Sequence, residues 1–598
     1  MFFYLDIRPS ENIQTDIMRL QEGAALPSIP EANALYIQVG KQKLLEFEVP
    51  TGKFLLLGDP IFQPEENLFE RIVSTADNVH LDLLFNKIKG HYYWFYMSSS
   101  ARGHFKCGTS FGAIYPIYYH FEKHGTLVSS SAFTLARQTN ADVKDKRNLL
   151  ERLLFNYPFF NSTWWANIHL LDAHRYLDIG ENSTKVSGTF EVSDYFGTPT
   201  HTTRDCLSEL AALFQRETEL FFPDEPFAVS LTGGFDGRTL VAAAQKANRE
   251  FVAYSFGRPD STDVSMPAAQ ATKIGIPYWP ILLDRVYVEQ HSLDSGRKFM
   301  QLTEYNGNWG RPHYHYAARS LSERTNYILT GNFGSELFRA LHEPGVMLSE
   351  YLIRVFSSTD DSWKDYLRQA AQYWDKNFFK EEIESLIADI ENYLVKMQGW
   401  DANHKFYHFV FNEIFRKYFG AELVMQSTYL NNRTPYLNLH LFQELNKTIW
   451  SGVHARLFEK MKSKRMKGQV FYATFIRQIA PQLYHLNTNK GYSPADVLEP
   501  WRLPLLASRV VWHKYLNRND IDDNSVEAFI QKYHLTIARQ LTDATSSLFR
   551  PYLERANAEI PLGHDIDKHI KMYSIATGWQ AADVASVPIA QDVPTIQT

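Results

Sequence analysis

The stretch between residues 226 and 257 constrains the fold of this chain more than any other. The apolar run FAVSLT is followed by the loop GGFDG, by the helical pattern RTLVAAAQKA and by a second apolar run, FVAYSFG. This order predicts a βαβ unit, and YWPILLD and NYILTG predict further strands. Strands that alternate with helices form a parallel sheet. We therefore expect an α/β domain here, with a mostly helical chain from about residue 360 onward.

A second helix is expected in the same region. The segment DVSMPAAQATKIG has helical spacing, with Asp263 as the expected cap and Gly275 as the expected stop.

The first 200 residues have a different pattern. Short apolar segments such as KLLEFEV and GHYYWFYMSS alternate in polarity and are bounded by turn residues, which is typical of paired antiparallel strands. A helix is expected near residues 145–156. The fold class is thus α/β, with an antiparallel β-rich domain at residues 1–200 and a parallel-sheet domain with a helical C-terminal part at residues 201–585. The last residues, 586–598, lack periodicity and are expected to be a disordered tail.

Composition excludes several classes of protein. The 598 residues include only two cysteines, Cys107 and Cys206, which excludes a disulfide framework and a Cys-rich metal site. The formal charge is −6 and no basic run is present, so a nucleic-acid partner is not expected. No stretch of about 20 apolar residues predicts a membrane span, and the short apolar N-terminus does not resemble a secretory signal. The expected location is cytoplasmic.

The loop SLTGGFDGRT combines three features that favour a bound polyphosphate. Gly233 and Gly234 allow a ligand to approach the backbone closely. The N–H groups at the start of the following helix attract anions. Asp236 would repel a phosphate unless a divalent cation lay between them. The alternative is a tight strand-to-helix turn in which Asp236 only caps the helix.

Several segments, in order, resemble one family. TGGFDG resembles the Ser-Gly-Gly-x-Asp-Ser pyrophosphate loop of N-type ATP pyrophosphatases, and the chain as a whole resembles the asparagine synthetase-like family, which includes β-lactam synthetases and lasso-peptide cyclases. The other similar segments are TSFGAIYPIYY at 109–119, LLDAHRYLDI, YILTGNFGSELF at 327–338, LNNRTPYLNLHL at 430–441 and NKGYSPADVL at 489–498.

The resemblance implies a fold and a reaction. Residues 1–200 would form an Ntn-hydrolase-like glutamine amidotransferase domain, and residues 201–585 a PP-loop synthetase domain of the adenine nucleotide α-hydrolase type. Family members activate a carboxylate with ATP and Mg²⁺, release pyrophosphate and pass the acyl-adenylate to an amine, with release of AMP. By resemblance the nucleotide would be bound by Ser230, Leu231, Thr232, Gly233, Gly234, Phe235, Asp236, Gly237, Ser255, Phe256, Thr330 and Gly331.

The resemblance also implies catalytic and metal-binding roles. Asp236 would bind Mg²⁺, and Lys490 would neutralise phosphate charge, although it could equally be a solvated loop lysine. Arg238 could add a donor or lie on the surface. Glu413 could act as the base toward the amine, or could instead pair with Arg416 or Lys417 on its own helix.

The chain departs from the family at four positions. Phe2 replaces the nucleophilic cysteine that glutamine-using members carry after the initiator Met, so the N-terminal domain is expected to be inactive toward glutamine. Asn332 stands at the position of a catalytic Glu or Tyr. Ser335 replaces a second metal carboxylate, for which the adjacent Glu336 could substitute. Gly237 replaces a serine.

These observations favour an ATP-dependent amide-forming ligase or cyclase that does not use glutamine. Its substrates would be a carboxylate and an amine, carried by small molecules or by a peptide. In one alternative the protein is a lasso-type cyclase of a ribosomal peptide, with a leader-binding protein or a protease as partner. In another it is a nucleotide-binding pseudoenzyme, which the residues Asn332 and Ser335 favour. A homodimer is left open. Two cysteines and the negative charge argue against a tRNA-modifying enzyme.

Overall fold

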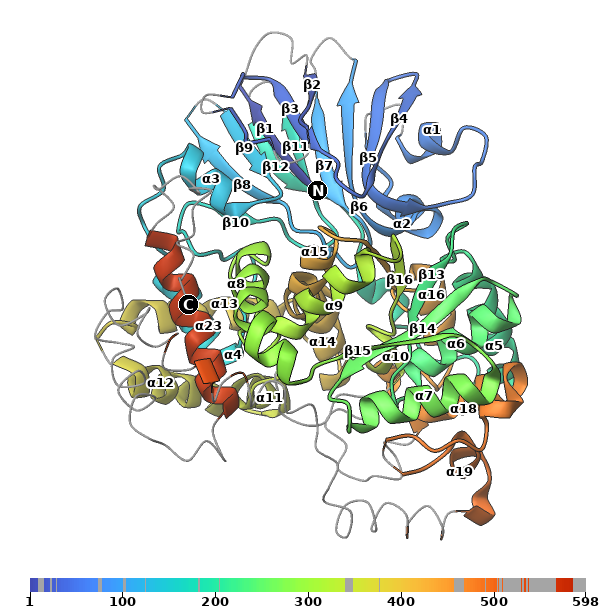
Figure 1. Cartoon of the computed structure of the whole chain (residues 1–598). Helices are drawn as coiled ribbons and strands as arrows, with labels where there is room; N and C mark the ends of the chain where they lie inside the picture. The colour runs from blue at the N-terminus through green and yellow to red at the C-terminus, as the bar shows by residue number, and fades with distance from the viewer. Residues whose placement is uncertain are drawn as a thin grey trace.

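The computed structural model of the chain contains three β-sheets and many helices (Figure 1). The structure describes all residues except 9–14, 22–23, 28–29, 74–77, 100–103, 124, 181–182, 204, 339–347, 376, 456–466, 490, 503, 505–507, 509–528, 530–531, 534–535, 537–565 and 584–598. The expected tail at 586–598 therefore lies outside the described residues.

The N-terminal part is a sandwich of two six-stranded sheets. The first has the order β10-β8-β9-β1-β3-β2 and is antiparallel except for the parallel pair β2–β3. Its strands are β1 (Phe2–Ile7), β2 (Asp16–Arg19), β3 (Ala34–Gln38), β8 (Tyr118–Glu122), β9 (Gly125–Ser129) and β10 (His169–Leu170).

The second sheet, of order β12-β11-β7-β6-β5-β4, is antiparallel throughout. Its strands are β4 (Lys43–Val49), β5 (Gly52–Ile61), β6 (Lys89–Ser98), β7 (Phe105–Thr109), β11 (Tyr176–Gly180) and β12 (Ser183–Ser187). Aromatic side chains join the two sheets: the ring of Phe3 in β1 lies 4.9 Å from that of Tyr93 and 5.0 Å from that of Phe95, both in β6. The apolar face of each sheet is thus buried against the other.

Four α-helices and one 3₁₀ turn are described within the first 200 residues. They are α1 (Leu68–Ile72), α2 (Leu81–Lys87), α3 (Ala132–Gln138), α4 (Lys146–Phe155) and the 3₁₀ turn η1 (Val192–Tyr195). The helix expected near 145–156 is therefore confirmed as α4.

The third sheet is parallel, with the order β15-β14-β13-β16-β17. Its strands are β13 (Phe227–Ser230), β14 (Phe251–Gly257), β15 (Tyr278–Leu282), β16 (Tyr327–Leu329) and β17 (Asn431–Arg433). Alternate residues face opposite sides: Val229 belongs to the main core with Leu240 of the following helix, whereas Ala228 packs in a second core with Ala317. Helices thus bury both faces of the sheet, as its apolar strands require.

The helices next to this sheet are α5 (Cys206–Glu219), α6 (Asp236–Lys246), α7 (Thr262–Ile274), the π-helix η2 (Tyr287–His291), α8 (Ser292–Leu302), α9 (Pro312–Ser322) and α10 (Gly334–Phe338). Two of them, α6 and α7, were predicted from the sequence and begin within two residues of the expected positions. Gly275 ends α7 in the left-handed region, with φ of 71°. The expectation that Asp263 caps α7 is wrong, because Ser261 is the N-cap residue and no side chain caps the helix.

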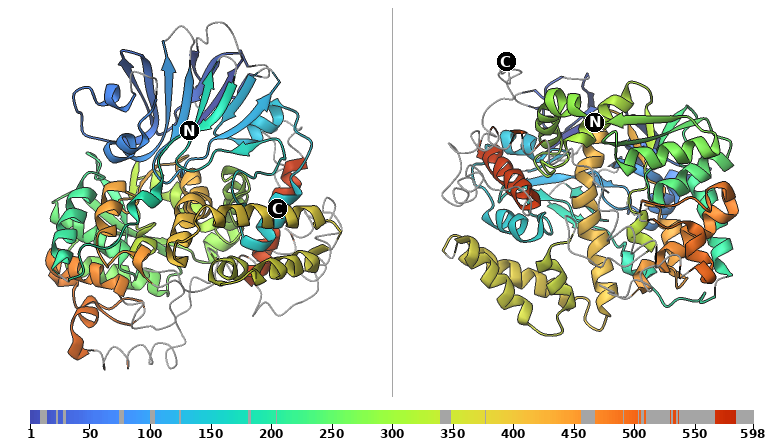
Figure 2. Two further views of the ribbon diagram at one scale, coloured as in Figure 1. Left: turned by 180° about the vertical axis from the view of Figure 1, so that it is seen from behind. Right: turned by 60° about the horizontal axis from the view of Figure 1, so that its bottom comes forward.

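The remaining chain is mainly helical, as expected. Its elements are α11 (Glu350–Ser357), α12 (Ser362–Asp375), α13 (Lys380–Val395), α14 (Ala402–Phe409), η3 (Val410–Phe419), α15 (Gly420–Gln426), α16 (Leu439–Asn446), η4 (Gly452–His454), α18 (Lys467–Ile479), η5 (Pro481–Leu483), α19 (Pro494–Leu498), η6 (Pro500–Arg502) and α23 (Ile566–Asp583). Figure 2 shows α23, in red, on the far side of the molecule from the parallel sheet; it packs against α4.

Buried polar contacts join the sandwich to the parallel sheet. Arg433 of β17 donates two hydrogen bonds to Asp59 of β5, at 2.7 and 2.9 Å. Both side chains are almost fully buried. The structure confirms an α/β protein with antiparallel and parallel sheets, while the domain boundary near residue 200 stays a prediction. Among the described helices, none has the length and apolar character needed to cross a bilayer.

Candidate functional site

The candidate site lies where the order of the parallel sheet reverses. Strand β13 is the first along the chain, and its two neighbours in the sheet are β14 on one side and β16 on the other. The loops that leave β13 and β16 therefore start side by side at the carboxyl edge. Open parallel sheets bind ligands in the crevice at this kind of position.

Glycines bring these two loops into close contact. A Cβ atom at Gly331, after β16, would lie 2.8 Å from the Cβ atom of Asp236, and one at Gly334 would lie 3.0 Å from Oδ1 of Asp236. A Cβ at Gly237 would lie 2.2 Å from the carbonyl oxygen of Ser230. These positions exclude larger residues for steric reasons. At Gly237, Gly331 and Gly334 the atoms that approach closely belong to the protein itself, whereas the sequence pattern at Gly233 and Gly234 was interpreted as room for a ligand.

Asp236 is the first residue of α6 and is held from two directions. The hydroxyl of Ser335 donates to its Oδ2 atom at 2.8 Å, and the hydroxyl of Tyr436 donates to its backbone carbonyl at 3.0 Å. The carboxylate and the Ser335 hydroxyl are oxygen donors of the kind that Mg²⁺ prefers. The N-cap residue of α6, Phe235, offers no side-chain hydrogen bond to the first turn. The start of α6 thus keeps the features of an anion-binding helix end.

A small cavity of about 70 Å³ borders Asp236. It is lined by Gly234, Phe235, Asp236, Ser335, Gln469, Tyr472, Thr488, Asn489 and Tyr492. Small-molecule sites usually enclose about 300–1,000 Å³. The cavity is large enough for a few water molecules and a cation. Because a nucleotide is larger, its binding would require the side chains of Tyr472, Tyr492 and Asn489 to move.

Arg238 has a structural role, in contrast to the donor role expected from the sequence. Its side chain is fully buried, and its two terminal nitrogens donate to the carbonyls of Leu486 and Asn487 at 2.7 and 2.9 Å. Burial lowers the pKa of the guanidinium to about 10. Arg238 thereby fixes the loop that carries Asn489, whose backbone N–H donates to the Gly233 carbonyl. Lys490, the next residue, lies outside the described residues.

The residues expected along the strand ends have partners within the protein. The Ser255 hydroxyl donates to the Asp263 carbonyl at 2.6 Å and lies 2.7 Å from the Tyr278 hydroxyl. The Thr330 hydroxyl donates to Asn432 at 2.8 Å. Phe256 packs against the ring of His313, at 5.3 Å between centroids. These side chains stabilise the sheet edge. The Thr232 hydroxyl accepts from the Gly234 N–H and so shapes the loop itself.

Glu413 forms the ion pairs that the sequence analysis offered as the alternative to catalysis. Its carboxylate accepts from Arg416 at 2.9 Å and from Lys417, and also from the Phe160 N–H at 2.8 Å. The group is buried. Of the two alternatives for Glu413, the structure thus favours the ion pair over a base that acts on the amine.

Of the residues Asn332, Ser335 and Glu336, for which metal-binding or catalytic roles were expected, Ser335 is the one whose side chain bonds Asp236 among the described contacts. Ser335 contacts Asp236, whereas the backbone carbonyl of Glu336 accepts from Tyr407. Asn332 lies partly exposed on the same loop, next to Phe333, which has a strained φ of 70°. Within the described residues, no three His, Cys, Asp or Glu side chains are grouped to hold a metal. Asp236 would therefore need phosphate oxygens to complete a magnesium site.

Some residues at the candidate site were not singled out in the sequence. Tyr436, which donates to the Asp236 carbonyl, belongs to the segment LNNRTPYLNLHL. Gln469 and Tyr472 lie on α18, and Tyr492 follows the loop at 486–489. Only the family-like motifs at 430–441 and 489–498 offered a signal for two of them, and α18 offered none.

Comparisons with known proteins leave the family open. No protein-family model matches the chain. None of the curated proteins matches it either. Among solved structures, 22 chains match, and one of them is glutamine phosphoribosylpyrophosphate amidotransferase from B. subtilis, solved with ADP and GMP. That match has 10% sequence identity and a TM-score of 0.15, and it covers 55% of this chain and 71% of the other. So low a TM-score does not establish a shared fold.

Proposed function

We propose that this protein is an ATP-dependent ligase that joins a carboxylate to an amine without using glutamine. The observation that carries the proposal is the place of Asp236. It begins a helix at the switch point of the parallel sheet, within a glycine loop, and it faces the glycine loop of the neighbouring strand. The Ntn-hydrolase-like and PP-loop assignments of the two parts of the chain belong to this proposal.

The proposed reaction has two steps. A carboxylate oxygen of the acid attacks the α-phosphorus of ATP, the bond to the β-phosphate breaks, and pyrophosphate leaves. The amine nitrogen then attacks the acyl carbon of the adenylate, AMP leaves, and the amine loses a proton to solvent. Magnesium would neutralise charge on the departing pyrophosphate.

The residues of the loop have defined tasks in this scheme. Asp236 would hold the magnesium ion, with the Ser335 hydroxyl orienting its carboxylate. The backbone N–H groups of Gly234 to Gly237 would bind phosphate oxygens, because the glycines leave the backbone open to the ligand. Phe2 supports an amine source other than glutamine, since no thiol stands at that position.

The enzymatic test is ATP–pyrophosphate exchange with a panel of candidate acids. At least one acid should promote exchange in the wild-type protein. Asp236→Asn should reduce the exchange rate by about tenfold or more. Asp260→Asn is the control: its carboxylate pairs with Arg258 at the surface, and the exchange rate should not change. Exchange that Asp236→Asn leaves unaltered would contradict the assignment.

A second candidate function is nucleotide binding without catalysis. The cavity of about 70 Å³ and the hydroxyl of Ser335, in place of a second carboxylate, favour it. This candidate predicts that MgATP binds but that no acid supports exchange.

A further inference from the structure

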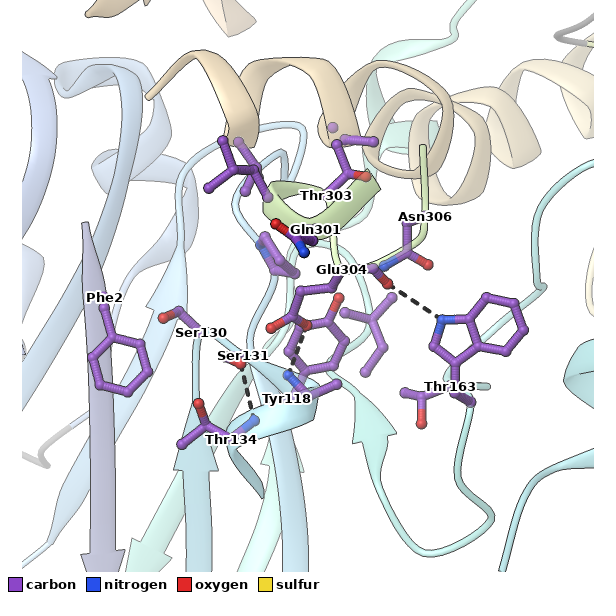
Figure 3. A pocket seen from close by; sticks show the side chains of 18 of the residues that line it. Phe2, Tyr118, Ser130, Ser131, Thr134, Thr163, Gln301, Thr303, Glu304 and Asn306 are labelled. Carbon is purple, nitrogen blue, oxygen red and sulfur yellow. Dashed lines mark hydrogen bonds between the residues drawn. The ribbon is translucent and has the colours of Figure 1, made fainter. Parts of the chain in front are cut away.

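A second and much larger cavity lies between the sandwich and the helices. It encloses about 730 Å³, within the range of small-molecule sites. Its walls come from β1, α3 and α4 on one side and from the end of α8, η3 and α15 on the other. None of its lining residues borders the Asp236 cavity. Figure 3 shows Ser130 and Thr134 near the apolar ring of Phe2, and Thr163 on the opposite side of the cavity.

Arg152 provides a buried positive charge in this wall. Its side chain is 4% exposed, its guanidinium lies 3.8 Å from the ring centroid of Trp164, and it donates to the amide oxygens of Asn148 and Asn306 at 2.8 and 2.6 Å. Within the described residues these partners are neutral. Burial lowers the pKa of Arg152 to about 9.

Arg137 adds a second cationic group at the same cavity. Its Nε atom is buried and has no hydrogen-bond partner among the described residues. A buried donor without a partner is destabilising, so the guanidinium of Arg137 is not fully satisfied by the protein alone. Arg416 and Lys417 also line the cavity, but both are already paired with the Glu413 carboxylate.

Glu304 lies at the cavity in a conformation that the backbone does not favour. Both Glu304 and Tyr305 have positive φ, at 49° and 57°. The Glu304 carboxylate accepts from the Ala132 N–H at 2.9 Å and so bonds the start of α3 (Figure 3). The Glu304 side chain is therefore bonded to α3, and it also lies close enough to Arg137 to act on it electrostatically. Consecutive strained residues persist where surrounding contacts impose them, often at ligand sites.

We propose that this cavity binds a small organic carboxylate, with Arg152 and Arg137 as the cationic groups that recognise it. The carboxylate would bring a negative charge to Arg152, whose bonded partners are neutral, and would pair with the Arg137 guanidinium. The apolar body of the ligand would contact Phe2 and the neighbouring apolar wall. A planar guanidinium matches a carboxylate in two parallel hydrogen bonds. The hydroxyl groups of the wall would bind any further polar groups. This inference is independent of the proposed ligase function.

The test compares matched pairs of probes by calorimetry. Phenylacetate, benzoate, hexanoate and glutarate are titrated into the full-length protein, each beside its uncharged amide. At least one carboxylate should bind at least tenfold more tightly than its amide, and Arg137→Gln should weaken its binding about tenfold. Arg285→Gln, at an exposed site outside the cavity, and Asp236→Asn should not weaken it.

Arg152→Gln gives a second variant, checked for folding by near-UV circular dichroism, and it should also weaken the carboxylate. The proposal is overturned if carboxylate and amide bind equally or if Arg137→Gln leaves binding unaltered. It is also overturned if no probe binds at a concentration of about 10 mM. Binding of inorganic phosphate in preference to every carboxylate would also overturn it. Because Asp236 is not at this cavity, a failed ligase test would not affect these results.

Discussion

At the scale of single residues, the candidate site depends on close contacts that only glycine permits. The sequence predicted the loop at 232–237 and the importance of Asp236, because the residue types themselves carry the signal. It could not predict the role of Arg238, because the carbonyls that bind its side chain, at Leu486 and Asn487, are distant in sequence. Asp263 was misassigned for a different reason. The N-cap position depends on the local backbone conformation, and Ser261 has that conformation.

The contact between Gly331 and Asp236 gives a steric prediction. Gly331→Ala should lower the free energy of unfolding by about 1–3 kcal/mol, because the new methyl group would lie 2.8 Å from the Asp236 Cβ atom. Gly234→Ala is the control, since its methyl group would only meet Thr232 Oγ1 at 3.5 Å. Urea denaturation of both variants measures the difference. Equal stabilities would mean that the two loops are not packed as described.

Glu304 gives a prediction about pH. Burial raises its pKa to about 7, from an ordinary value of 4.5. The native protein would hold this proton up to about pH 7, whereas the unfolded chain releases it near pH 4.5, so this group makes stability fall as pH rises between these values. Glu304→Gln should remove roughly 2 kcal/mol of that fall, since one pKa unit is about 1.4 kcal/mol and the side chain keeps some exposure.

The measurement is chemical denaturation of wild type and Glu304→Gln at pH 5 and pH 8. Glu384→Gln, at an exposed ion pair, serves as the control and should keep the wild-type dependence. A Glu304→Gln protein with the same change in stability from pH 5 to pH 8 as the wild type would disprove the assigned pKa.

At the scale of elements, the sequence predicted the strands that carry an apolar pattern and missed one that does not. Strand β17 consists of Asn431, Asn432 and Arg433, all buried. It has no strand signal because its buried polar groups are bonded to side chains far away in the sequence, as Arg433 is to Asp59. The strand order and the π-helix η3 were also beyond prediction, since both depend on tertiary packing.

The Asp59–Arg433 pair predicts a strong coupling between β5 and β17. Asp59→Asn should destabilise the protein by about 3 kcal/mol, because it leaves a buried guanidinium without its charge partner. Breaking the exposed pair Arg368–Glu384 with Glu384→Gln should change stability by less than about 1 kcal/mol. If the two variants lose the same free energy of unfolding, the Asp59–Arg433 pair does not stabilise the contact between β5 and β17.

At the scale of the whole molecule, the protein presents two separate sites. The smaller one, at the switch point of the parallel sheet, carries the proposed nucleotide chemistry. The larger one lies between the sandwich and the helices. Residues of the segment TSFGAIYPIYY and Phe2 line it, but the fold alone brings them together with residues of α3, α4, α8 and η3. The coarse α/β class followed from patterning, but neither cavity could be located without the structure.

The central claim is that Asp236 binds the diphosphate of a nucleotide through magnesium. Calorimetric titration of ATP into the wild-type protein and into Asp236→Asn, each with Mg²⁺ and with EDTA, tests it most directly. The account predicts that wild type binds MgATP, that EDTA weakens binding, and that Asp236→Asn weakens MgATP about tenfold (about 1.4 kcal/mol) while losing most of the metal dependence. Equal MgATP affinity in both proteins, or no binding in the wild type, would contradict the account.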